Sequence, residues 1–290
     1  MPKLFYDEAF LLEPNKKSIL ITGCSSGIGL SSAKALSQEG WEVFASCRKH
    51  KDVKILQEIG LNAIQLDYTS QKSIEKAVVT VLEKTNGHLD ALFNNGAFAI
   101  PGALEDMPTE ALRAIFETNV FGWHSLTRAV IPVMRSQGYG KIIQCSSILG
   151  FIALAYRGPY NSTKWALEGL SDTLRLELEG SGIHVISIRP GPINTKFREN
   201  AVFHFRKWID QNSSFFKEIY EKEIGPKLDD SSKASIFQLE AEAVTKKVIQ
   251  ALNAPNPSMV YSVTLPTYFM AFLIRVLPKF IIHRLLLSMS

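Results

Sequence analysis

The hydrophobic pattern alternates along most of the chain between two kinds of segment. Short apolar, β-branched runs that end in turn residues are typical of buried parallel strands. They stand at 17–22, 41–46, 62–67, 89–95, 140–147 and 183–191. Between them, apolar residues at helical spacing predict helices over 27–39, up to about 59, 71–85, 108–137 and 159–180. Strands separated by helices indicate βαβ units, so we expect an α/β fold with a doubly wound parallel sheet of about seven strands.

Single residues predict where some of these helices begin, end or bend. Ser70 stands where it could cap the helix over 71–85, and Gly40 follows the helix over 27–39. Pro132 lies inside the long helical pattern over 108–137 and is expected to break or bend it. No repeat, low-complexity tract or linker divides the chain. We therefore expect residues 1–290 to form a single domain.

Composition narrows the class of protein. Hydrophobic residues make up 46% of the 290 and charged residues 21%, as in ordinary globular proteins. A net charge of +4 without a basic run argues against a nucleic-acid partner, and the six histidines show no metal-ligand spacing. Cys24, Cys47 and Cys145 are odd in number and fit reduced core residues. The first fourteen residues lack a signal-peptide run, so a reducing, cytoplasmic location is expected.

The stretch "ITGCSSGIGL" over 21–30 fits two kinds of site. Gly23-x-Ser25-x-Gly27 matches the elbow that presents a serine nucleophile in hydrolases, whereas Gly23, Gly27 and Gly29 match a dinucleotide-binding loop. Only one strand precedes Ser25, so no earlier strand can supply the oxyanion loop that a hydrolase needs. A glycine loop directly after the first strand places a helix N-terminus against pyrophosphate. The order of strands favours a Rossmann-type phosphate loop.

Further motifs follow this loop in a fixed order. They are "NNGA" at 94–97, Asn119 in "TNVFG", Ser147 in "CSSILG", Tyr160-x-x-x-Lys164, and "RPGPINT" at 189–195. Together with Thr22-Gly23-x-x-x-Gly27-Ile28-Gly29 they make residues 17–255 resemble the short-chain dehydrogenase/reductase family. Within it the chain resembles bacterial NADP-dependent aldehyde reductases and 17β-hydroxysteroid and retinol dehydrogenases. "NNGA" departs from the family's N-N-A-G by exchanging its last two residues.

Tyrosine with a nearby lysine suits proton transfer. A free tyrosine has a pKa of about 10, which is too high for an efficient acid–base catalyst at neutral pH. Lys164 lies one helical turn after Tyr160, so its charge, with an oxidised nicotinamide, is expected to lower that pKa. Ser147 ends a strand and is placed to orient a substrate oxygen. By resemblance, Asn119 would hold a water that connects Lys164 to a proton relay.

The end of the second strand bears on the cofactor. An acidic residue there is typical of NAD enzymes, whereas this chain has Cys47 followed by Arg48, which suits the 2′-phosphate of NADP(H). A solvated basic turn is the alternative. By resemblance, the cofactor-binding residues are Thr22, Gly23, Ser25, Ser26, Gly27, Ile28, Gly29, Arg48, Asp67, Asn95, Ala97, Tyr160, Lys164, Pro190, Gly191, Ile193 and Thr195.

Two later segments bear on the substrate. Residues 196–235, where the family builds a substrate lid, are rich in aromatics: Phe197, Phe203, Phe205, Trp208, Phe215, Phe216 and Tyr220. Ordinary helix packing would explain them equally well. The segment 259–290 is apolar but broken by prolines and basic residues, and it is too short to span a bilayer. We expect two short helices that cover the pocket; the alternative is a helix lying on a membrane surface.

These observations predict an NADP(H)-dependent oxidoreductase acting on a lipophilic aldehyde, ketone or alcohol. A steroid or retinoid dehydrogenase of the same family is the runner-up, because only the pocket would differ. A nucleotide-binding regulator without catalysis is less favoured, because Tyr160 and Lys164 are both present. A homodimer is compatible with the sequence but is not indicated by it.

Overall fold

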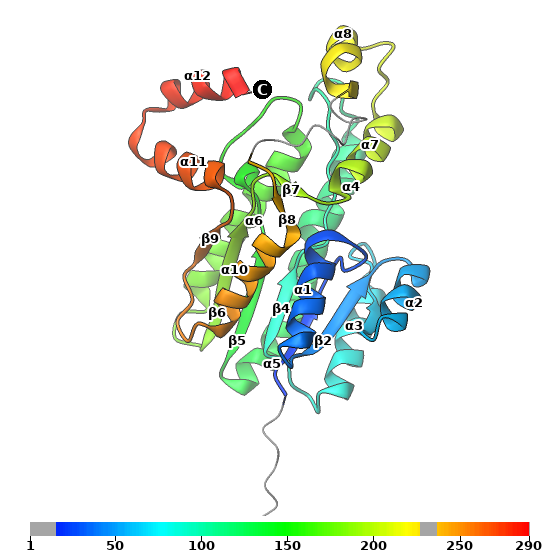
Figure 1. The fold of residues 1–290 in the computed structure, drawn as a ribbon, viewed down its shortest axis with the longest axis vertical. Coiled ribbons are helices and arrows are strands. Elements are labelled where there is room, and N and C mark those ends of the chain that lie inside the picture. The colour runs from blue at the N-terminus through cyan, green and yellow to red at the C-terminus, as the bar shows by residue number, and fades with distance from the viewer. Residues whose placement is uncertain (1–15, 227–236, 290) are drawn as a thin grey trace, which may run out of the picture.

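The computed structural model describes residues 16–226 and 237–289 (Figure 1). The predictions for the first fourteen residues and for part of the lid, residues 227–235, fall outside these ranges. No helix among the described residues is long and apolar enough to cross a bilayer.

Seven parallel strands form the central sheet in the order β3-β2-β1-β4-β5-β6-β9 (Figure 1). Their bounds are β1 Ser18–Ile21, β2 Glu42–Cys47, β3 Asn62–Gln65, β4 Ala91–Asn94, β5 Gly140–Cys145, β6 Ile183–Arg189 and β9 Val260–Ser262. The six located strands and the predicted fold class are confirmed. The seventh, β9, pairs with β6 and brings the sheet to the predicted total of about seven, although the apolar pattern did not locate it.

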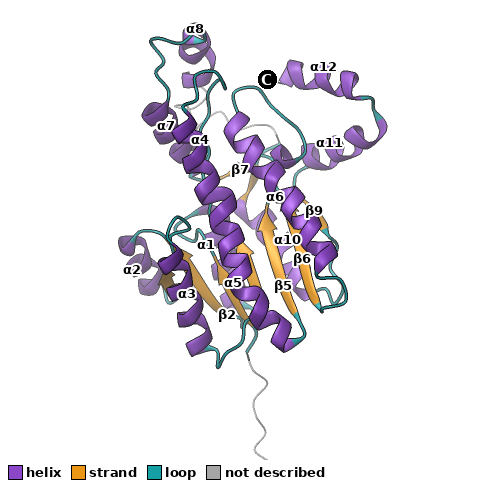
Figure 2. Cartoon of the chain, turned by 180° about the vertical axis from the view of Figure 1, so that it is seen from behind, coloured by secondary structure: helices purple, strands orange, loops and turns teal. Residues whose placement is uncertain are grey.

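Helices cover both faces of the sheet. α1 and α10 pack together on the face seen in Figure 1, and α3 and α5 pack together on the face seen in Figure 2. Hydrogen bonds from Ser31 and Ser32 to Thr245 join α1 to α10. The bounds are α1 Gly27–Gln38, α2 His50–Glu58, α3 Gln71–Lys84, α4 Thr109–Phe116, α5 Gly122–Gln137, α6 Gly158–Glu177 and α10 Ala241–Asn253. Ser70 caps α3, as predicted, by accepting a hydrogen bond from the Ser73 amide.

The long helical region breaks at a different place from the one predicted. A π-helical turn over Glu117–Phe121 separates α4 from α5, whereas Pro132 lies inside α5. The Gly122 amide donates to the carbonyl of Glu117, five residues back, which is the π-helical spacing. The helical region therefore breaks at the turn that carries Asn119 and not at Pro132.

Two parts of the chain beyond β6, the lid region and the helices after β9, project from the carboxyl end of the sheet (Figure 1). Strand β7, Ile193–Asn194, pairs with β8, Leu239–Glu240, in a separate two-stranded sheet. The lid region holds α7 Phe197–Trp208, α8 Lys217–Ile219 and a π-helical turn at Tyr220–Ile224. After β9, α11 Leu265–Val276 and α12 Lys279–Met289 are the two short helices predicted for the tail.

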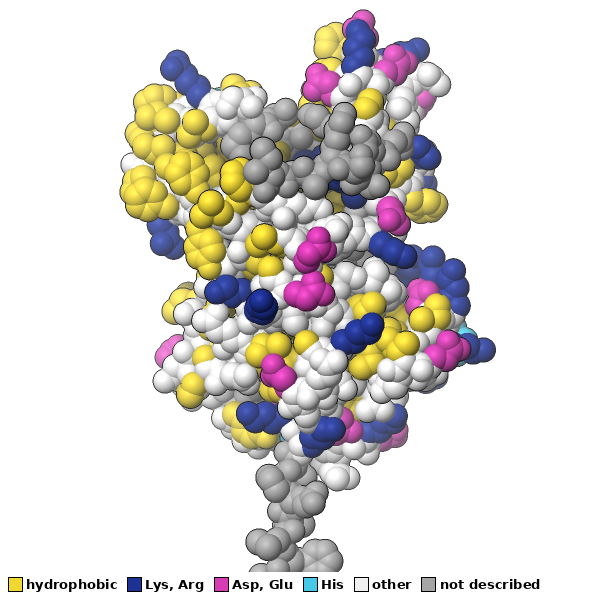
Figure 3. All heavy atoms as spheres, viewed as in Figure 1, with side chains coloured by type: hydrophobic (Ala, Val, Ile, Leu, Met, Phe, Trp, Pro, Cys, Tyr) yellow, Lys and Arg dark blue, Asp and Glu magenta, His cyan; other side chains and the backbone are white. Residues whose placement is uncertain are grey.

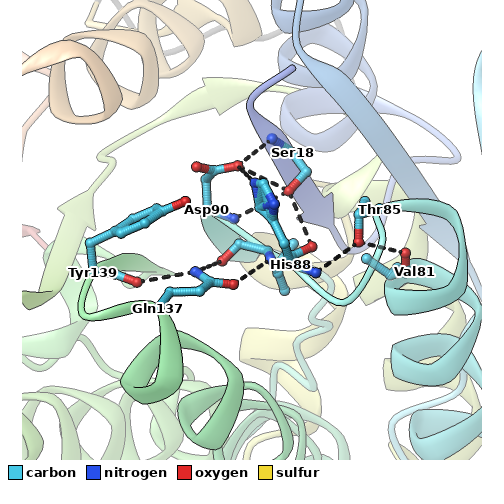
Figure 4. A network of polar contacts seen from close by, with 8 residues as sticks. Ser18, Val81, Thr85, His88, Asp90, Gln137 and Tyr139 are labelled. Carbon is cyan, nitrogen blue, oxygen red and sulfur yellow. Dashed lines mark hydrogen bonds and ion pairs between the residues drawn. The ribbon is translucent and has the colours of Figure 1, made fainter. Parts of the chain in front are cut away.

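A polar network holds the opposite end of the sheet together (Figure 4). The Asp90 carboxylate, before β4, accepts hydrogen bonds from the Ser18 amide at 2.6 Å and hydroxyl at 3.0 Å, and lies 3.0 Å from His88 Nε2. Gln137, at the end of α5, makes two hydrogen bonds to the backbone of Leu89. This network joins β1, β4 and α5 far from the carboxyl ends of the strands. Ser18, although it lies near a histidine and an aspartate, is fully buried and serves structure.

The core lies on both sides of the central strands. β1 and β4 are buried along their whole length, as the continuous apolar runs predict. Cys24, Cys47 and Cys145 are free and buried, in agreement with their assignment to the core. Burial raises the pKa of the Cys47 and Cys145 thiols to about 11, so both stay protonated at neutral pH.

Candidate active site

The glycine loop after β1 packs directly on the turn after β4. A Cβ placed on Gly23 would lie 2.6 Å from the Gly96 Cα, and φ at Gly23 is +69°, so both space and backbone require glycine. The Asn95 side-chain amide donates to the Thr22 carbonyl at 3.0 Å. Gly96, the residue by which "NNGA" departs from N-N-A-G, therefore stands at the closest approach of the two loops.

Thr22 connects three strands beneath this contact. Its hydroxyl accepts hydrogen bonds from the Asn95 and Gly96 amides at 2.8 and 3.1 Å and from the Tyr68 hydroxyl at 2.7 Å. Tyr68 follows β3, and its hydroxyl also lies 2.8 Å from the Asn94 side-chain oxygen, so its one proton is shared between the two acceptors. These groups are buried, so the network fixes the floor of the glycine loop.

The N-terminus of α1 opens onto the loop after β6. Ser26 is the N-cap residue in extended conformation, and its side chain caps no helix amide. Gly27 has φ +56°, and a Cβ there would lie 2.9 Å from Thr195 Cγ2. Ser25 is exposed at the same loop, whereas Gly29 is buried. The glycine loop therefore presents small residues and backbone at the N-terminus of α1, where an anionic phosphate can come close to the helix amides.

Ser147 and Tyr160 meet at the carboxyl end of β5. A hydrogen bond joins their hydroxyls, and Ser147 also accepts from the Leu149 amide at 3.1 Å. Burial raises the pKa of Tyr160 above its ordinary value, and the bond to Ser147 partly offsets this. The expected lowering of the Tyr160 pKa is therefore not found for the protein by itself, because desolvation of the phenolate and the neighbouring Cys145 both raise it and only the Ser147 bond opposes them.

Lys164 lies beneath Tyr160 with its ammonium group buried. Nζ donates to the Cys145 carbonyl at 2.7 Å and lies 5.5 Å from the centroid of the Tyr160 ring and 4.3 Å from that of Trp123. Burial lowers the pKa of Lys164 to about 8, and the charge of Glu168 opposes this shift. A cation with so low a pKa, held below a phenol, is arranged for proton chemistry rather than for solubility.

Asn119 acts as a bridge from the π-helical turn. Its side chain pairs with the backbone of Phe98 in both directions, accepting from the amide at 3.1 Å and donating to the carbonyl at 2.8 Å. The amide group also lies 3.4 Å from the Thr163 hydroxyl on α6. Asn119 thus joins the turn after β4 to the helix that carries Tyr160 and Lys164.

An ion pair fixes the Ser147 loop against α6. Arg189, at the end of β6, forms a bidentate pair with Glu168, with contacts of 2.8 and 2.7 Å. The Arg189 guanidinium also lies 5.1 Å from the Phe151 ring centroid, just after the 3-10 turn Ile148–Gly150. The Ile148 amide donates to the Pro190 carbonyl at 2.8 Å. These contacts hold the ends of β5 and β6 in register with Tyr160.

The remaining predicted cofactor residues line the same edge of the sheet. Ile28, Ala97 and Ile193 are half-buried and pack against the core. One carboxylate oxygen of Asp67, Oδ1, accepts hydrogen bonds from the amide and the hydroxyl of Thr69. Gly191 packs against the start of α11, where a Cβ would lie 2.0 Å from Thr264 Oγ1.

Arg48 is exposed at the end of β2, and α7 reaches toward it. His204 on α7 stacks on Phe98, with ring centroids 4.1 Å apart. Burial, followed by the charges of Lys207 and Arg48, lowers the pKa of His204 to about 4. Arg48 and Lys207 therefore form a basic surface around a neutral histidine.

The first residue of α7 reaches the other end of the cleft. The Phe197 ring lies edge-on to Tyr160 at a centroid distance of 5.3 Å. α7 thus runs from Tyr160 toward Arg48. Phe205 and Tyr220 are buried in a separate small core, whereas Phe203 and Phe215 are exposed, so the aromatic segment is partly packing and partly surface.

The comparisons with known proteins agree with this arrangement. The family model described as short chain dehydrogenase matches residues 17–203. The chain belongs to the short-chain dehydrogenase family. It is 38% identical over 271 residues to YbbO, an uncharacterized oxidoreductase of Escherichia coli (strain K12), a match that covers 93% of this chain and 94% of the relative. Like other members, it is an oxidoreductase that acts on CH–OH or C=O groups.

Two further matches extend the comparison. An NADPH-dependent 3-dehydrocapnine reductase of Ornithobacterium rhinotracheale is 33% identical over 84% of this chain and 87% of its own. The crystal structure of a short-chain dehydrogenase from Streptomyces avermitilis superposes with a TM-score of 0.75 at 28% identity, covering 90% of this chain and 94% of that one.

Several residues of the site escaped the sequence analysis. Tyr68 follows the predicted Asp67 directly, and its position after a strand was the only available signal. Trp123, which donates to the Gly96 carbonyl at 2.8 Å and packs on Lys164, looked like an ordinary core residue. Glu168 lies one turn after Lys164 and could have been found from that spacing. His204 gave no signal, because its partners lie far away in sequence.

Proposed function

We propose that the enzyme transfers hydride between NADP(H) and a lipophilic aldehyde, ketone or alcohol. The observation that carries this proposal is the joining of Ser147, Tyr160 and Lys164 at the carboxyl end of the sheet, beside a glycine loop. Asn119, Ser147, Tyr160 and Lys164 are the proposed catalytic residues. The nicotinamide, when bound, would supply or accept the hydride.

The protein's own part in the reaction is to hold the substrate oxygen and to move a proton. Ser147 and Tyr160 share a hydrogen bond, so an oxygen that takes its place between them would accept from both hydroxyls. During carbonyl reduction the Tyr160 phenol gives its proton to that oxygen. The Lys164 ammonium below the ring stabilises the phenolate left behind. Asn119 bonds both to the turn after β4 and to α6, and so holds the helix that carries Tyr160 and Lys164 in position.

The residues present fit a dinucleotide phosphate. The glycine loop leaves no room for side chains at Gly23 and Gly27, so backbone amides can approach a pyrophosphate closely. Cys47 stands where an acidic residue would select NAD, Arg48 follows it, and Lys207 adds positive charge on the same side. These features support NADP(H). The other fourteen predicted contact residues are proposed on the same basis, with Asp67 near the adenine and Thr195 near the nicotinamide.

An apolar neighbourhood supports a lipophilic substrate. A hollow of about 580 Å³ beside α6 is lined mainly by apolar residues, among them Ala103, Leu154, Tyr156 and Phe216. It also includes Asn161, the residue after Tyr160. We propose that the described part of the lid, residues 196–226, covers this side of the site. The buried, free thiols support a reducing compartment such as the cytoplasm.

The first test is a substitution of the proposed acid. Tyr160→Phe should reduce kcat by about 10²–10⁴-fold, since a positioned proton donor is lost, while NADPH binding stays nearly unchanged. Tyr139→Phe, at the opposite end of the sheet, is the matched control and should keep wild-type activity. Wild-type turnover by a folded Tyr160→Phe variant would refute the assignment.

The substrate class needs a separate measurement. Straight-chain aldehydes, steroids and retinoids are compared with NADPH and NADH by following nicotinamide absorbance. A lipophilic pocket should raise kcat/KM about three- to fourfold for each added methylene until the pocket is full. A flat profile across the aldehydes would reject a lipophilic pocket, and activity with steroids or retinoids alone would favour the runner-up.

A further inference from the structure

The helix α11 carries its apolar stripe on the outside. Leu265, Tyr268, Phe269, Phe272 and Val276 follow the i, i+3, i+4, i+7 spacing of one helix face, and all are exposed, Phe269 and Phe272 by 60% and 61%. The opposite face, with Thr267 and Met270, packs against the body. In a globular protein such a stripe normally faces the core. Here it faces away from it.

The second helix of the arm repeats this arrangement. Phe280, His283, Arg284 and Leu287 lie on one face of α12 and are exposed, whereas Ile282 on the other face is buried. We call α11 and α12, Leu265–Met289, the arm. It stands out to one side of the body, and Figure 3 shows hydrophobic side chains gathered over it, with basic side chains at the edges. Nine of the large hydrophobic side chains exposed among the described residues lie in this short segment.

The charge of the arm indicates what covers this surface. Residues 259–290 contain Arg275, Lys279, His283 and Arg284 and no aspartate or glutamate. In a symmetric pair the same surface meets itself, so a second copy would bring basic residues together and be repelled. An anionic lipid surface instead accepts the apolar side chains between its headgroups and attracts the basic ones. Neither helix is long enough to span it.

The arm is firmly attached where it leaves the sheet. Thr264 and Thr267 at the start of α11 are fully buried, and their hydroxyls lie 2.9 Å apart. They pack against Gly191, in the loop after β6. The exposed stripe therefore has a defined orientation relative to the sheet rather than hanging on a loose tail.

We propose that the arm lies on an anionic membrane surface, with the α11 stripe and Phe280 and Leu287 of α12 inserted between headgroups and Arg275, Lys279 and Arg284 at the phosphates. This places the carboxyl end of the sheet, where the active site opens, toward the lipid. The enzyme is thereby a peripheral membrane protein. The inference goes beyond the proposed reaction and stands on the arm alone.

Vesicle co-sedimentation of the full chain tests this proposal. Vesicles of phosphatidylcholine with phosphatidylglycerol are compared with vesicles of phosphatidylcholine alone. The wild type should bind the anionic vesicles. The pair Phe269→Ser and Phe272→Ser should reduce binding by roughly tenfold or more for each side chain. The pair Arg275→Glu and Lys279→Glu should lose at least about fivefold for each charge, with the loss confined to anionic vesicles.

The matched control changes exposed apolar residues outside the arm. Ile55→Ser with Val79→Ser, on α2 and α3, removes 54% and 52% exposed side chains and should bind like the wild type. Absence of wild-type binding, or equal binding by the Phe269→Ser/Phe272→Ser variant, would overturn the proposal. Sedimentation velocity without lipid tests whether a second copy of the chain covers the arm instead. An oligomer that the arm variants dissociate would show that a second copy takes this surface, and would overturn the proposal.

Discussion

Removing the Tyr220 hydroxyl should loosen the lid without disturbing the rest of the fold. This hydroxyl donates to the Asp106 carboxylate and accepts from the Ala103 amide at 2.9 Å, so it joins the lid to the turn after β4. Ser214 donates to the same carboxylate at 2.6 Å. In Tyr220→Phe the buried Ala103 amide loses its partner, while water can reach the half-buried Asp106.

The expected cost follows from that difference in burial. A buried amide left without a partner costs about 1–3 kcal/mol. The hydrogen bond that Asp106 loses costs less, because water offsets most of it. Opening of the lid should therefore become roughly five- to 150-fold more favourable, because 1.4 kcal/mol corresponds to a factor of ten. The change affects local opening first, since the lid has its own small core apart from the main one.

Hydrogen exchange followed by mass spectrometry measures this directly. Peptides within 197–226 of Tyr220→Phe should exchange faster by that factor, while peptides from β1, β4 and β5 keep their rates. Tyr261→Phe is the control, because its hydroxyl also accepts a backbone amide, that of Ser258 at 3.1 Å, but lies at β9. Unchanged exchange in the lid, or the same acceleration throughout the chain, would refute the reasoning.

Three further outcomes are expected. Arg48→Glu should weaken NADPH binding by roughly ten- to a hundredfold, because a charge-assisted bond is lost, and should weaken NADH binding far less. Both affinities are measured by titration, with Lys54→Glu as the control. Equal losses for the two cofactors would contradict the NADP(H) assignment. Carbonyl reduction should fall as pH rises through about 8, because the Lys164 ammonium, whose pKa burial lowers to about 8, is present only below that pH; a kcat/KM profile without this limb would count against it. Asp90→Asn should lower the free energy of unfolding by about 1–3 kcal/mol in urea titrations and leave kcat unchanged, because Asp90 lies at the far end of the sheet.

The parts of the fold that local patterns determine could be predicted from the sequence. Apolar runs located six strands, and the glycine loop and the Tyr160–Lys164 spacing pointed to one edge of the sheet. Strand β9 escaped because three residues, Val260–Ser262, inside an apolar tail carry no periodicity that distinguishes a strand from a helix.

Predictions failed where long-range contacts or burial decide the outcome. Pro132 was expected to break or bend the long helix, yet the break lies at the π-helical turn that carries Asn119, which no composition signal marks. The pKa of Tyr160 was expected to fall beside Lys164 and an oxidised nicotinamide, whereas in the protein alone burial, which only the fold reveals, raises it. His204 became part of the site only because α7 folds back over Phe98.

The π-helical turn makes chain length critical at one point. Glu117–Phe121 holds one residue more than an α-helical ladder needs, so deleting a residue there would let α4 and α5 fuse into one regular helix. Such a deletion mends the backbone ladder while rotating everything on one side of it by about 100°. Asn119 would then lose its hydrogen bonds to Phe98 and Thr163, so a more regular helix would come with lower activity. A change of one residue in chain length at this turn should therefore lower activity more than it lowers the stability of the helix.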